Sequence, residues 1–129
     1  MSEQPTGTLT FLFTDIEGST RRWEEDSAAM QAAVALHDAI LRTAIESHSG
    51  VVFKTGGDAF YAVFTSAADA ITAVLAGQQE LAAVDWGALG RIQVRMALHT
   101  GIAEVRDDDY FGPPLNRVSR LLSSGYGGQ

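Results

Sequence analysis

The sequence predicts a single α+β domain in which strands and helices follow the order β-α-β-β-α-β-α. Two kinds of pattern support this fold class: short runs rich in β-branched and aromatic residues, and longer stretches in which apolar residues recur at helical spacing. A chain of 129 residues that is 46% hydrophobic can bury a substantial core. We therefore expect residues 1–129 to form one domain.

The first strand is expected at residues 8–14, because apolar and threonine side chains alternate there. By the same period of two, Asp15 points to the side of the strand that carries its phenylalanines. A helix should follow, with Asp26 or Ser27 as its N-cap and Gly50 at its end. The apolar stripe of this helix comprises Met30, Ala33, Val34, His37, Leu41, Ala44 and Ile45.

A β-hairpin is predicted over residues 51–64, where two β-rich runs are divided by Gly56-Gly57. With these glycines as a two-residue turn, Lys54 and Asp58 would point to opposite faces of the hairpin.

After the hairpin, Ser66 and Asp69 form a capping-box pattern at the start of a second long helix. The next segment, residues 91–99, alternates as a strand in which Arg95 projects away from the apolar side chains.

An acidic segment at residues 104–112 is expected to be a loop, and the run Asp107-Asp108-Asp109 within it a solvated stretch. Pro113-Pro114 then suits the first turn of a last helix, which should end near Gly125.

Charge and composition exclude several classes of protein. The formal charge of −7 argues against a nucleic-acid backbone as partner, because such binding relies on Lys and Arg. The chain has no Cys, so disulfides and thiolate chemistry are excluded. The N-terminus lacks a signal-peptide pattern, and no run approaches the roughly 20 apolar residues of a membrane span. We expect a cytoplasmic domain that is not attached to a membrane.

Asp15 and Asp58 are candidate metal ligands. Each lies beside a predicted strand end, so the two carboxylates would meet at one edge if the strands are neighbours in the sheet. Hard oxygen ligands beside a glycine turn suit Mg²⁺ or Mn²⁺ bound together with substrate phosphates. The small residues after Asp15 would leave backbone N–H groups open to phosphate oxygens. The alternative is that each Asp only caps a turn.

Other polar residues are also candidates. Asn116 and Arg120 have i, i+4 spacing and would share one surface of the last helix, either as a functional face or as a solvated stripe. Arg95 is either an anion clamp or a surface charge. No His or Cys spacing typical of a metal site occurs, and no serine lies in a nucleophile-elbow context, so covalent catalysis is not expected.

The three histidines have structural interpretations. His37 lies on the apolar helical stripe and should be a hydrogen-bonded core residue. His48 lies near the helix end, where a favourable dipole interaction is available, and His99 has no obvious partner.

Four segments, in this order and with these gaps, resemble the catalytic domain of class III nucleotidyl cyclases: "FTDIEGST", "FKTGGDAFYAVF", "VRMALHTG" and "DYFGPPLNRVSRL". The likeness is greater to short bacterial adenylate cyclase domains and runs from about Thr8 to the C-terminus. It implies a ferredoxin-like, palm-type antiparallel sheet with helices packed on it. Family domains continue beyond the position of Gln129 with further strands and a helix.

The resemblance implies that Asp15 and Asp58 bind two Mg²⁺ or Mn²⁺ ions that bridge a triphosphate. Backbone groups after Asp15 would contact metal or phosphate: Ile16, Gly18, Ser19 and Thr20.

By the same resemblance, Lys54 and Asp109 would read the purine edge, a combination that selects adenine, whereas guanylate cyclases have Glu and a small residue there. Asn116 would orient the ribose, Arg120 would stabilise charge on the α-phosphate, and Arg95 would contact the triphosphate. The implied reaction converts ATP to 3′,5′-cyclic AMP and pyrophosphate.

In the family each active site forms between two protomers, so a homodimer is implied. One protomer would supply the Asp pair and the other Lys54, Asp109, Asn116 and Arg120. Two alternatives stay open. "GGDAF" resembles the signature of diguanylate cyclases, although Ala59 replaces its glutamate. The chain could also be a catalytically silent module that binds nucleotide or pairs with a longer cyclase.

Overall fold

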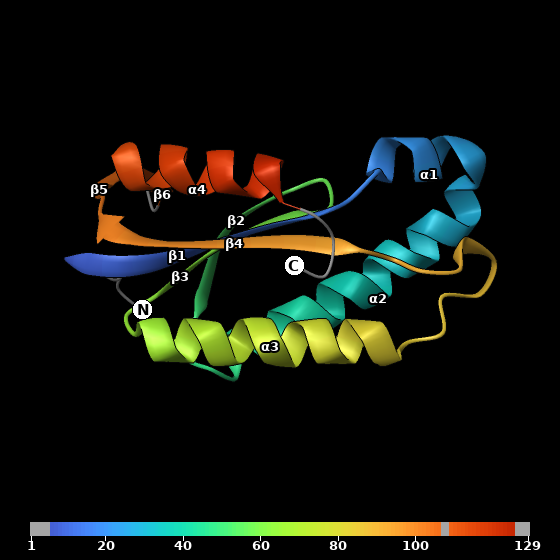
Figure 1. Cartoon of the computed structure of the whole chain (residues 1–129), viewed down its shortest axis with the longest axis horizontal. Coiled ribbons are helices and arrows are strands. Elements are labelled where there is room, and N and C mark those ends of the chain that lie inside the picture. Colours follow the sequence, from blue (N-terminus) through green and yellow to red (C-terminus); the bar gives the residue numbers. More distant parts are fainter. Residues whose placement is uncertain (1–5, 107–108, 126–129) are drawn as a thin grey trace.

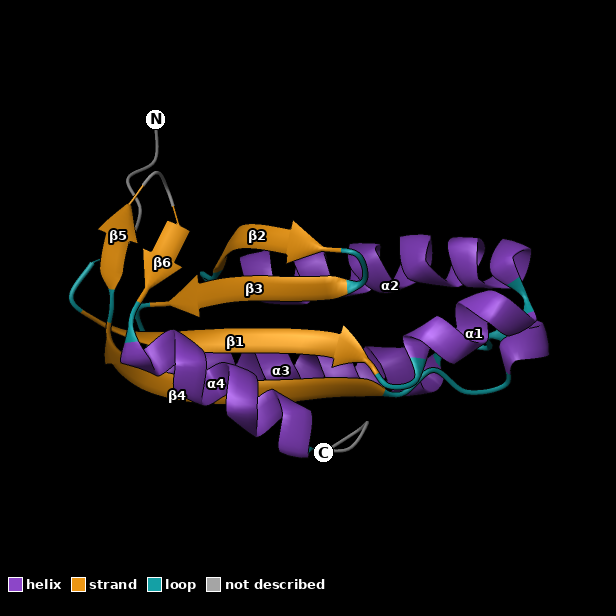
Figure 2. Cartoon of the chain, turned by 90° about the horizontal axis from the view of Figure 1, so that it is seen from above, coloured by secondary structure: helices purple, strands orange, loops and turns teal. Residues whose placement is uncertain are grey.

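A computed structural model describes residues 6–106 and 109–125. At its centre lies a four-stranded antiparallel sheet with the strand order β2-β3-β1-β4 (Figure 2). These strands are β1 (Thr8–Ile16), β2 (Val51–Gly56), β3 (Ala59–Phe64) and β4 (Val94–Ile102).

Helices cover both faces of this sheet (Figure 1). Helices α2 (Ser27–Glu46) and α3 (Ala67–Ala83) pack on one face, and α4 (Pro113–Ser124) packs on the other. A short helix, α1 (Ser19–Glu25), follows β1, and a 3₁₀ turn, η1 (Gly87–Leu89), precedes β4. Strands β5 (Glu104–Arg106) and β6 (Asp109–Phe111) form a separate two-stranded sheet. The predicted α+β class is confirmed, with α1, β5 and β6 as additional elements.

The central sheet separates two hydrophobic cores because side chains alternate along each strand. The core under α2 and α3 includes Leu12, Ile16, Met30, Leu41, Phe60, Phe64 and Val94. The core under α4 includes Leu9, Phe11, Phe13, Val63, Tyr110, Leu115 and Val118.

The helix starts form as the sequence predicts. Asp26 is the N-cap of α2, and its carboxylate accepts a hydrogen bond from the backbone N–H of Ala29 at 3.0 Å. The hydroxyl of Ser66 accepts one from the N–H of Asp69 at the start of α3. The last helix begins at Pro113 and has Gly125 as its C-cap.

The predicted role of Gly50 as the residue that ends α2 is wrong. The helix ends at Glu46, and Ser49 takes the left-handed conformation, with φ of 67°. Gly50 is needed instead for close packing, because a Cβ on it would lie 2.5 Å from the ring of Phe64.

The hairpin register also differs from the prediction. Gly56 pairs with Ala59, so Gly57 and Asp58 form the turn, and Gly57 has φ of 60°. A shift in register between Val52 and Lys54 marks a β-bulge, which changes the face to which later side chains point.

Because of this bulge, Lys54 lies opposite Tyr61 on the α4 face of the sheet. Asp58 belongs to the turn and not to a strand, so alternation does not set its direction. The expectation that Lys54 and Asp58 point to opposite faces of one hairpin therefore rests on a wrong register.

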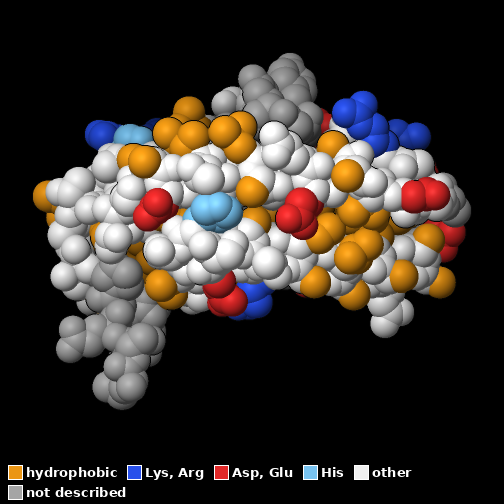
Figure 3. Space-filling view, turned by 90° about the horizontal axis from the view of Figure 1, so that it is seen from below, with side chains coloured by type: hydrophobic (Ala, Val, Ile, Leu, Met, Phe, Trp, Pro, Cys, Tyr) orange, Lys and Arg blue, Asp and Glu red, His pale blue; other side chains and the backbone are white. Residues whose placement is uncertain are grey.

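The segment expected to be an acidic loop contains β5 and β6, which pair in register from Glu104 with Phe111 to Arg106 with Asp109. Asp107 and Asp108 lie outside the described residues. Within residues 6–106 and 109–125, no helix is long and apolar enough to cross a bilayer. On the described part of the face shown in Figure 3, Lys and Arg side chains lie toward the margins, among scattered acidic and hydrophobic groups.

Candidate active site

Asp15 and Asp58 lie at the same end of the central sheet, because β1 and β3 are antiparallel neighbours. Asp15 is the second-last residue of β1, and Asp58 is in the turn that leads into β3. The end of β1 and the turn between β2 and β3 lie at the same end of the sheet (Figure 2). The phenylalanines beside them do not share a face. Phe13 belongs to the core under α4, whereas Phe60 belongs to the core under α2 and α3. Strand order and strand ends therefore bring the two carboxylates to one edge.

Asp15 makes an ion pair with Arg95, its partner in the register of β1 and β4. Arg95 Nε donates to Asp15 Oδ1 at 2.7 Å, and Arg95 Nη2 donates to Asp15 Oδ2 at 2.5 Å. The hydrogen bonds to Asp15 raise the pKa of Arg95 above its usual value. The negative charges of Asp15, Glu17 and Asp58 act in the same direction, while burial opposes them. Arg95 thus pairs with one carboxylate of its own molecule, and the charges of two others favour its protonated form.

The segment after Asp15 turns directly into α1. Gly18 is the N-cap of this helix, with φ of 67°, a conformation that glycine adopts without strain. Ser19 and Thr20 are the first two helical residues, so their backbone N–H groups have no partner within the helix. The side chain of Ile16 is in the core, so only its backbone is available to a ligand.

The direction of the Ile16 backbone carbonyl follows from a hydrogen bond of the next residue. The N–H of Glu17 donates to the carbonyl of Gln93, beside β4, at 2.8 Å. In a trans peptide the C=O points opposite to the N–H, so the Ile16 carbonyl points away from β4. Strand β3 and the turn with Asp58 lie on that side of β1.

Asp15, Asp58 and the Ile16 carbonyl could supply oxygen ligands at this edge, the kind of ligand that Mg²⁺ and Mn²⁺ prefer. In the described part of the chain, no group of three or more His, Cys, Asp or Glu side chains could hold a metal ion. An ion at this edge would need further oxygen ligands, such as water or substrate phosphates, as Mg²⁺ commonly has.

Lys54 and Asp109 meet at a hollow on the α4 face. Lys54 Nζ lies 3.6 Å from Asp109 Oδ2, and the two side chains are 56% and 28% exposed. A pair this exposed contributes little to stability but is open to a ligand. The hollow has a volume of about 290 Å³ and includes Asn116 and Ser119. Its other walls are apolar or aromatic: Phe13, Phe53, Tyr61, Tyr110, Phe111 and Leu115.

Aromatic contacts hold this pair in place. The rings of Phe53 and Tyr110, each adjacent in sequence to one member of the pair, meet edge to face at 4.8 Å. Lys54 Nζ also lies 5.7 Å from the centre of the Tyr61 ring. Burial raises the pKa of the Tyr110 hydroxyl. Sequence reasoning missed these aromatic residues, because strand aromatics are ordinarily core residues and the bulge at Phe53 leaves no clear pattern.

Asn116 and Arg120 are exposed on α4, and their side chains make no hydrogen bond or ion pair with any residue that the structure describes. Asn116 lines the hollow with Lys54, whereas Arg120 lines a second one of about 430 Å³. The second hollow is bounded by His99, Arg117, Arg120, Leu121 and Ser124. The two residues share a helix surface but not a pocket within one chain.

The other histidines lie apart from these groups. His37 is fully buried and shares a hydrogen bond of 2.8 Å with Asp38, as expected of a core residue. His48 Nδ1 lies 2.7 Å from the Ala44 carbonyl near the end of α2.

An antiparallel sheet of this order, with two carboxylates at one edge and a Lys–Asp pair in a hollow beside α4, is the arrangement expected of a nucleotidyl cyclase catalytic domain. The whole chain, residues 1–129, matches the family described as adenylate and guanylate cyclase catalytic domain. The chain belongs to this family.

Two relatives match nearly the whole of this chain. An uncharacterized protein of Mycobacterium tuberculosis is 40% identical over 127 residues, which are 97% of this chain and 42% of that protein. The adenylate cyclase of Neurospora crassa is 35% identical over 150 residues, covering 97% of this chain and 6% of that protein. This chain thus spans less than half the length of these relatives.

Among solved structures, an adenylate cyclase from Trypanosoma brucei in its monomeric state superposes with a TM-score of 0.92 at 26% identity. The match covers 99% of this chain and 72% of that one.

Proposed function

We propose that this chain is an adenylate cyclase domain that converts ATP to 3′,5′-cyclic AMP and pyrophosphate, at sites formed between two copies of the chain. The Lys54–Asp109 pair in its aromatic-walled hollow carries this proposal. The name of the Neurospora crassa relative, an adenylate cyclase, supports it as well.

The chemistry of the pair favours adenine. A lysine ammonium can only donate hydrogen bonds, and an ionised carboxylate can only accept them. Adenine offers a ring nitrogen that accepts and an exocyclic amino group that donates, so both contacts are satisfied. Guanine presents a carbonyl oxygen in place of that amino group and would place an acceptor against Asp109. The flat aromatic walls are suited to stacking of a purine ring.

The remaining residues have proposed roles toward the ribose and phosphates. Asn116, on the edge of the base hollow, would orient the ribose, so that its 3′-hydroxyl faces the α-phosphate. Arg120 would donate hydrogen bonds to oxygens of the α-phosphate, where negative charge grows during the reaction. The backbone N–H groups of Ser19 and Thr20 would contact phosphate oxygens.

Asp15, Asp58 and the Ile16 carbonyl would hold two divalent ions, Mg²⁺ or Mn²⁺. When bound, such ions would lower the pKa of the attacking 3′-hydroxyl and neutralise charge on the pyrophosphate. The protein has a net charge of −7, so ions or arginines must offset the charge of the nucleotide near the two carboxylates.

Because Asn116 and Arg120 are exposed and unpartnered among the described residues, they are free to act toward a second chain. We propose that each site takes its two carboxylates from one copy of the chain and Lys54, Asp109 and the α4 residues from the other. Two equivalent sites then result from one symmetric dimer.

The test is a nucleotide cyclase assay on the purified protein with Mn²⁺. ATP should give cyclic AMP, GTP should give little product, and Asp58→Ala should abolish turnover. Glu80→Ala, which removes an exposed carboxylate of α3, should leave turnover unchanged. Equal use of GTP would contradict the proposed specificity.

Two other results would contradict the proposal, and each would support a different function. Metal-dependent ATP binding without turnover would indicate a silent nucleotide-binding module. A cyclic dinucleotide formed from GTP would indicate a diguanylate cyclase.

A further inference from the structure

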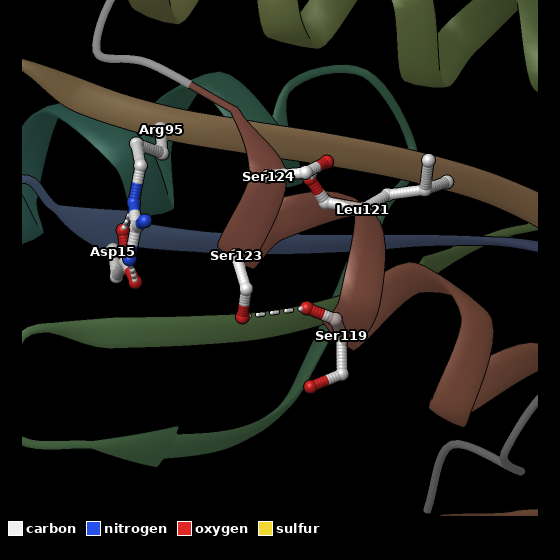
Figure 4. Close-up of polar contacts among 6 residues, drawn as sticks. All are labelled: Asp15, Arg95, Ser119, Leu121, Ser123 and Ser124. Carbon is white, nitrogen blue, oxygen red and sulfur yellow. Dashed lines mark hydrogen bonds and ion pairs between the residues drawn. The ribbon is translucent and has the colours of Figure 1, made fainter.

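The Asp15–Arg95 ion pair occupies the carboxylate on which the proposed metal site depends. Both carboxylate oxygens accept hydrogen bonds from the guanidinium, one from Nε and one from Nη2. Each side chain is 24% exposed, so solvent screens the pair only in part. In Figure 4 the two side chains point toward each other from β1 and β4, near the last turns of α4.

A divalent ion and this guanidinium are competitors for Asp15. The fork of an arginine takes one lone pair on each oxygen of a carboxylate, so a metal ion bound to the remaining lone pairs of these oxygens would lie close to the guanidinium and be repelled by it. An arginine does not lose its proton in proteins, so the repulsion between the two cations is not relieved by titration. The guanidinium of Arg95 therefore has to move away from Asp15 when a divalent ion binds there.

We propose that Arg95 is a resident counter-cation of the metal site: it neutralises Asp15 in the nucleotide-free protein and must leave this carboxylate before a divalent ion binds there. This inference rests on the proposed function, because it takes Asp15 as a metal ligand. Arg95 would then have two positions: on Asp15 in the nucleotide-free protein, and on phosphate when nucleotide is bound.

The surroundings of Arg95 explain why it stays on Asp15 in the absence of nucleotide. Glu17 and Asp58 add negative charge around the guanidinium, and β-sheet register holds residues 15 and 95 opposite each other. A nucleotide polyphosphate supplies the acceptors that could draw the guanidinium away, since arginine pairs with phosphate as well as with carboxylate. Metal and nucleotide should therefore bind together, and free metal alone should bind weakly.

The opposing interpretation is a structural one, in which Arg95 only ties β1 to β4 and holds Asp15 in the orientation that a metal ion needs. The two interpretations predict opposite effects of removing the guanidinium. If Arg95 competes, metal binding without nucleotide becomes tighter. If it only positions Asp15, metal binding becomes weaker or stays the same.

The test measures Mn²⁺ binding without nucleotide, by electron paramagnetic resonance of the free ion, and needs no catalytic turnover. Arg95→Gln should bind Mn²⁺ about tenfold or more tightly than the unchanged protein, the size expected for losing hydrogen bonds to a charged group. Arg95→Lys, which keeps the charge without the fork, should show a smaller gain. Adding a non-cyclisable ATP analogue should reduce the difference.

Arg42→Gln is the matched control, because Arg42 makes an i, i+4 ion pair with Glu46 on α2, on the other face of the sheet. Arg42→Gln should leave Mn²⁺ binding unchanged. Adding Asp15→Asn to Arg95→Gln should abolish the increase in Mn²⁺ affinity. Circular dichroism checks that each variant folds.

Unchanged, weaker or undetectable Mn²⁺ binding by both Arg95 variants would overturn the inference. Tighter binding by the variants, in a protein that makes no cyclic AMP, would support the inference and contradict the proposed function. Failure of the Arg95 inference and failure of the proposed cyclase function therefore give different results.

Discussion

Lys54 is the only lysine in the sequence, and its ammonium group is the proposed hydrogen-bond donor to the purine. Lys54→Met keeps the length of the side chain but removes its donor. We expect kcat/KM for ATP to fall about 10- to 100-fold, as for loss of a charged hydrogen bond, while kcat/KM for GTP changes little. Steady-state assays with both nucleotides measure this. An unchanged ratio of the two values would exclude Lys54 from base selection.

The lone lysine also permits a direct observation of the pair. Reductive ¹³C-methylation labels Lys54 and the N-terminal amine, and NMR then reports the environment of each. Asp109→Asn should shift the Lys54 signal and leave the N-terminal signal in place, since Asp109 lies 3.6 Å from Lys54 Nζ.

Arg120 and Arg117 offer a comparison on one helix, because both line the second hollow. Arg120→Ala should lower kcat by about 10²–10³ with little change in KM, because the proposed contact strengthens only as charge develops on the α-phosphate. Arg117→Ala should have little effect on kcat. A similar loss of kcat in both variants would indicate that the positive charge of this surface matters, and not a contact from Arg120.

At the scale of elements, the position of α4 depends on Gly101 of β4. A Cβ at this residue would lie 2.6 Å from Cγ of Pro114, in the first turn of α4. Gly101→Ala should therefore push α4 outward and lower the free energy of unfolding by about 1–3 kcal/mol. Because α4 carries Asn116 and Arg120, turnover should fall as well. Urea unfolding and the cyclase assay measure the two effects.

Gly56→Ala is the control for stability, since the nearest atom to a Cβ there is 3.8 Å away and the backbone has no positive φ. It should change the free energy of unfolding by less than about 1 kcal/mol. Equal stability of the Gly101 and Gly56 variants would show that β4 and α4 adjust to a methyl group without cost.

The elements that sequence patterns predicted correctly have strong local signals. The long helices have N-caps at Asp26 and Ser66, and the strands alternate with period two. The hairpin turn was misplaced by one residue because Gly56 and Gly57 both suit a turn, and local propensity does not distinguish them. Strands β5 and β6 have three residues each, which is too short for periodicity to reveal.

The candidate site was predictable in its residue types, and the family resemblance also paired Lys54 with Asp109, but local sequence patterns did not show which side chains meet. The register shift before Lys54 places it opposite Tyr61, and the rings of Phe53 and Tyr110 meet beside the Lys54–Asp109 pair. The pairing of Asp15 with Arg95 depends on the register of two strands whose residues are 80 positions apart in sequence. Patterns within a short window contain no information on such pairings.

At the scale of the whole molecule, the candidate residues form two groups. Asp15 and Asp58 lie at the edge where β1 ends, whereas Lys54, Asp109 and Asn116 gather around the hollow bounded by β6 and α4. One nucleotide that uses both groups in the proposed way takes them from two chains. The prediction at this scale is that two inactive variants complement each other.

Asp58→Ala removes a ligand from the first group, and Arg120→Ala removes a donor from α4, so each variant alone should be nearly inactive. In a mixed dimer, one site contains both changes and the other contains neither. With random exchange of chains in an equal mixture, half of the dimers are mixed, and about a quarter of the original activity should return. Titrating one variant into the other and measuring cyclic AMP gives this fraction. Activity that stays at the level of the separate variants would contradict a shared site, because a site built within one chain leaves no intact copy in any dimer.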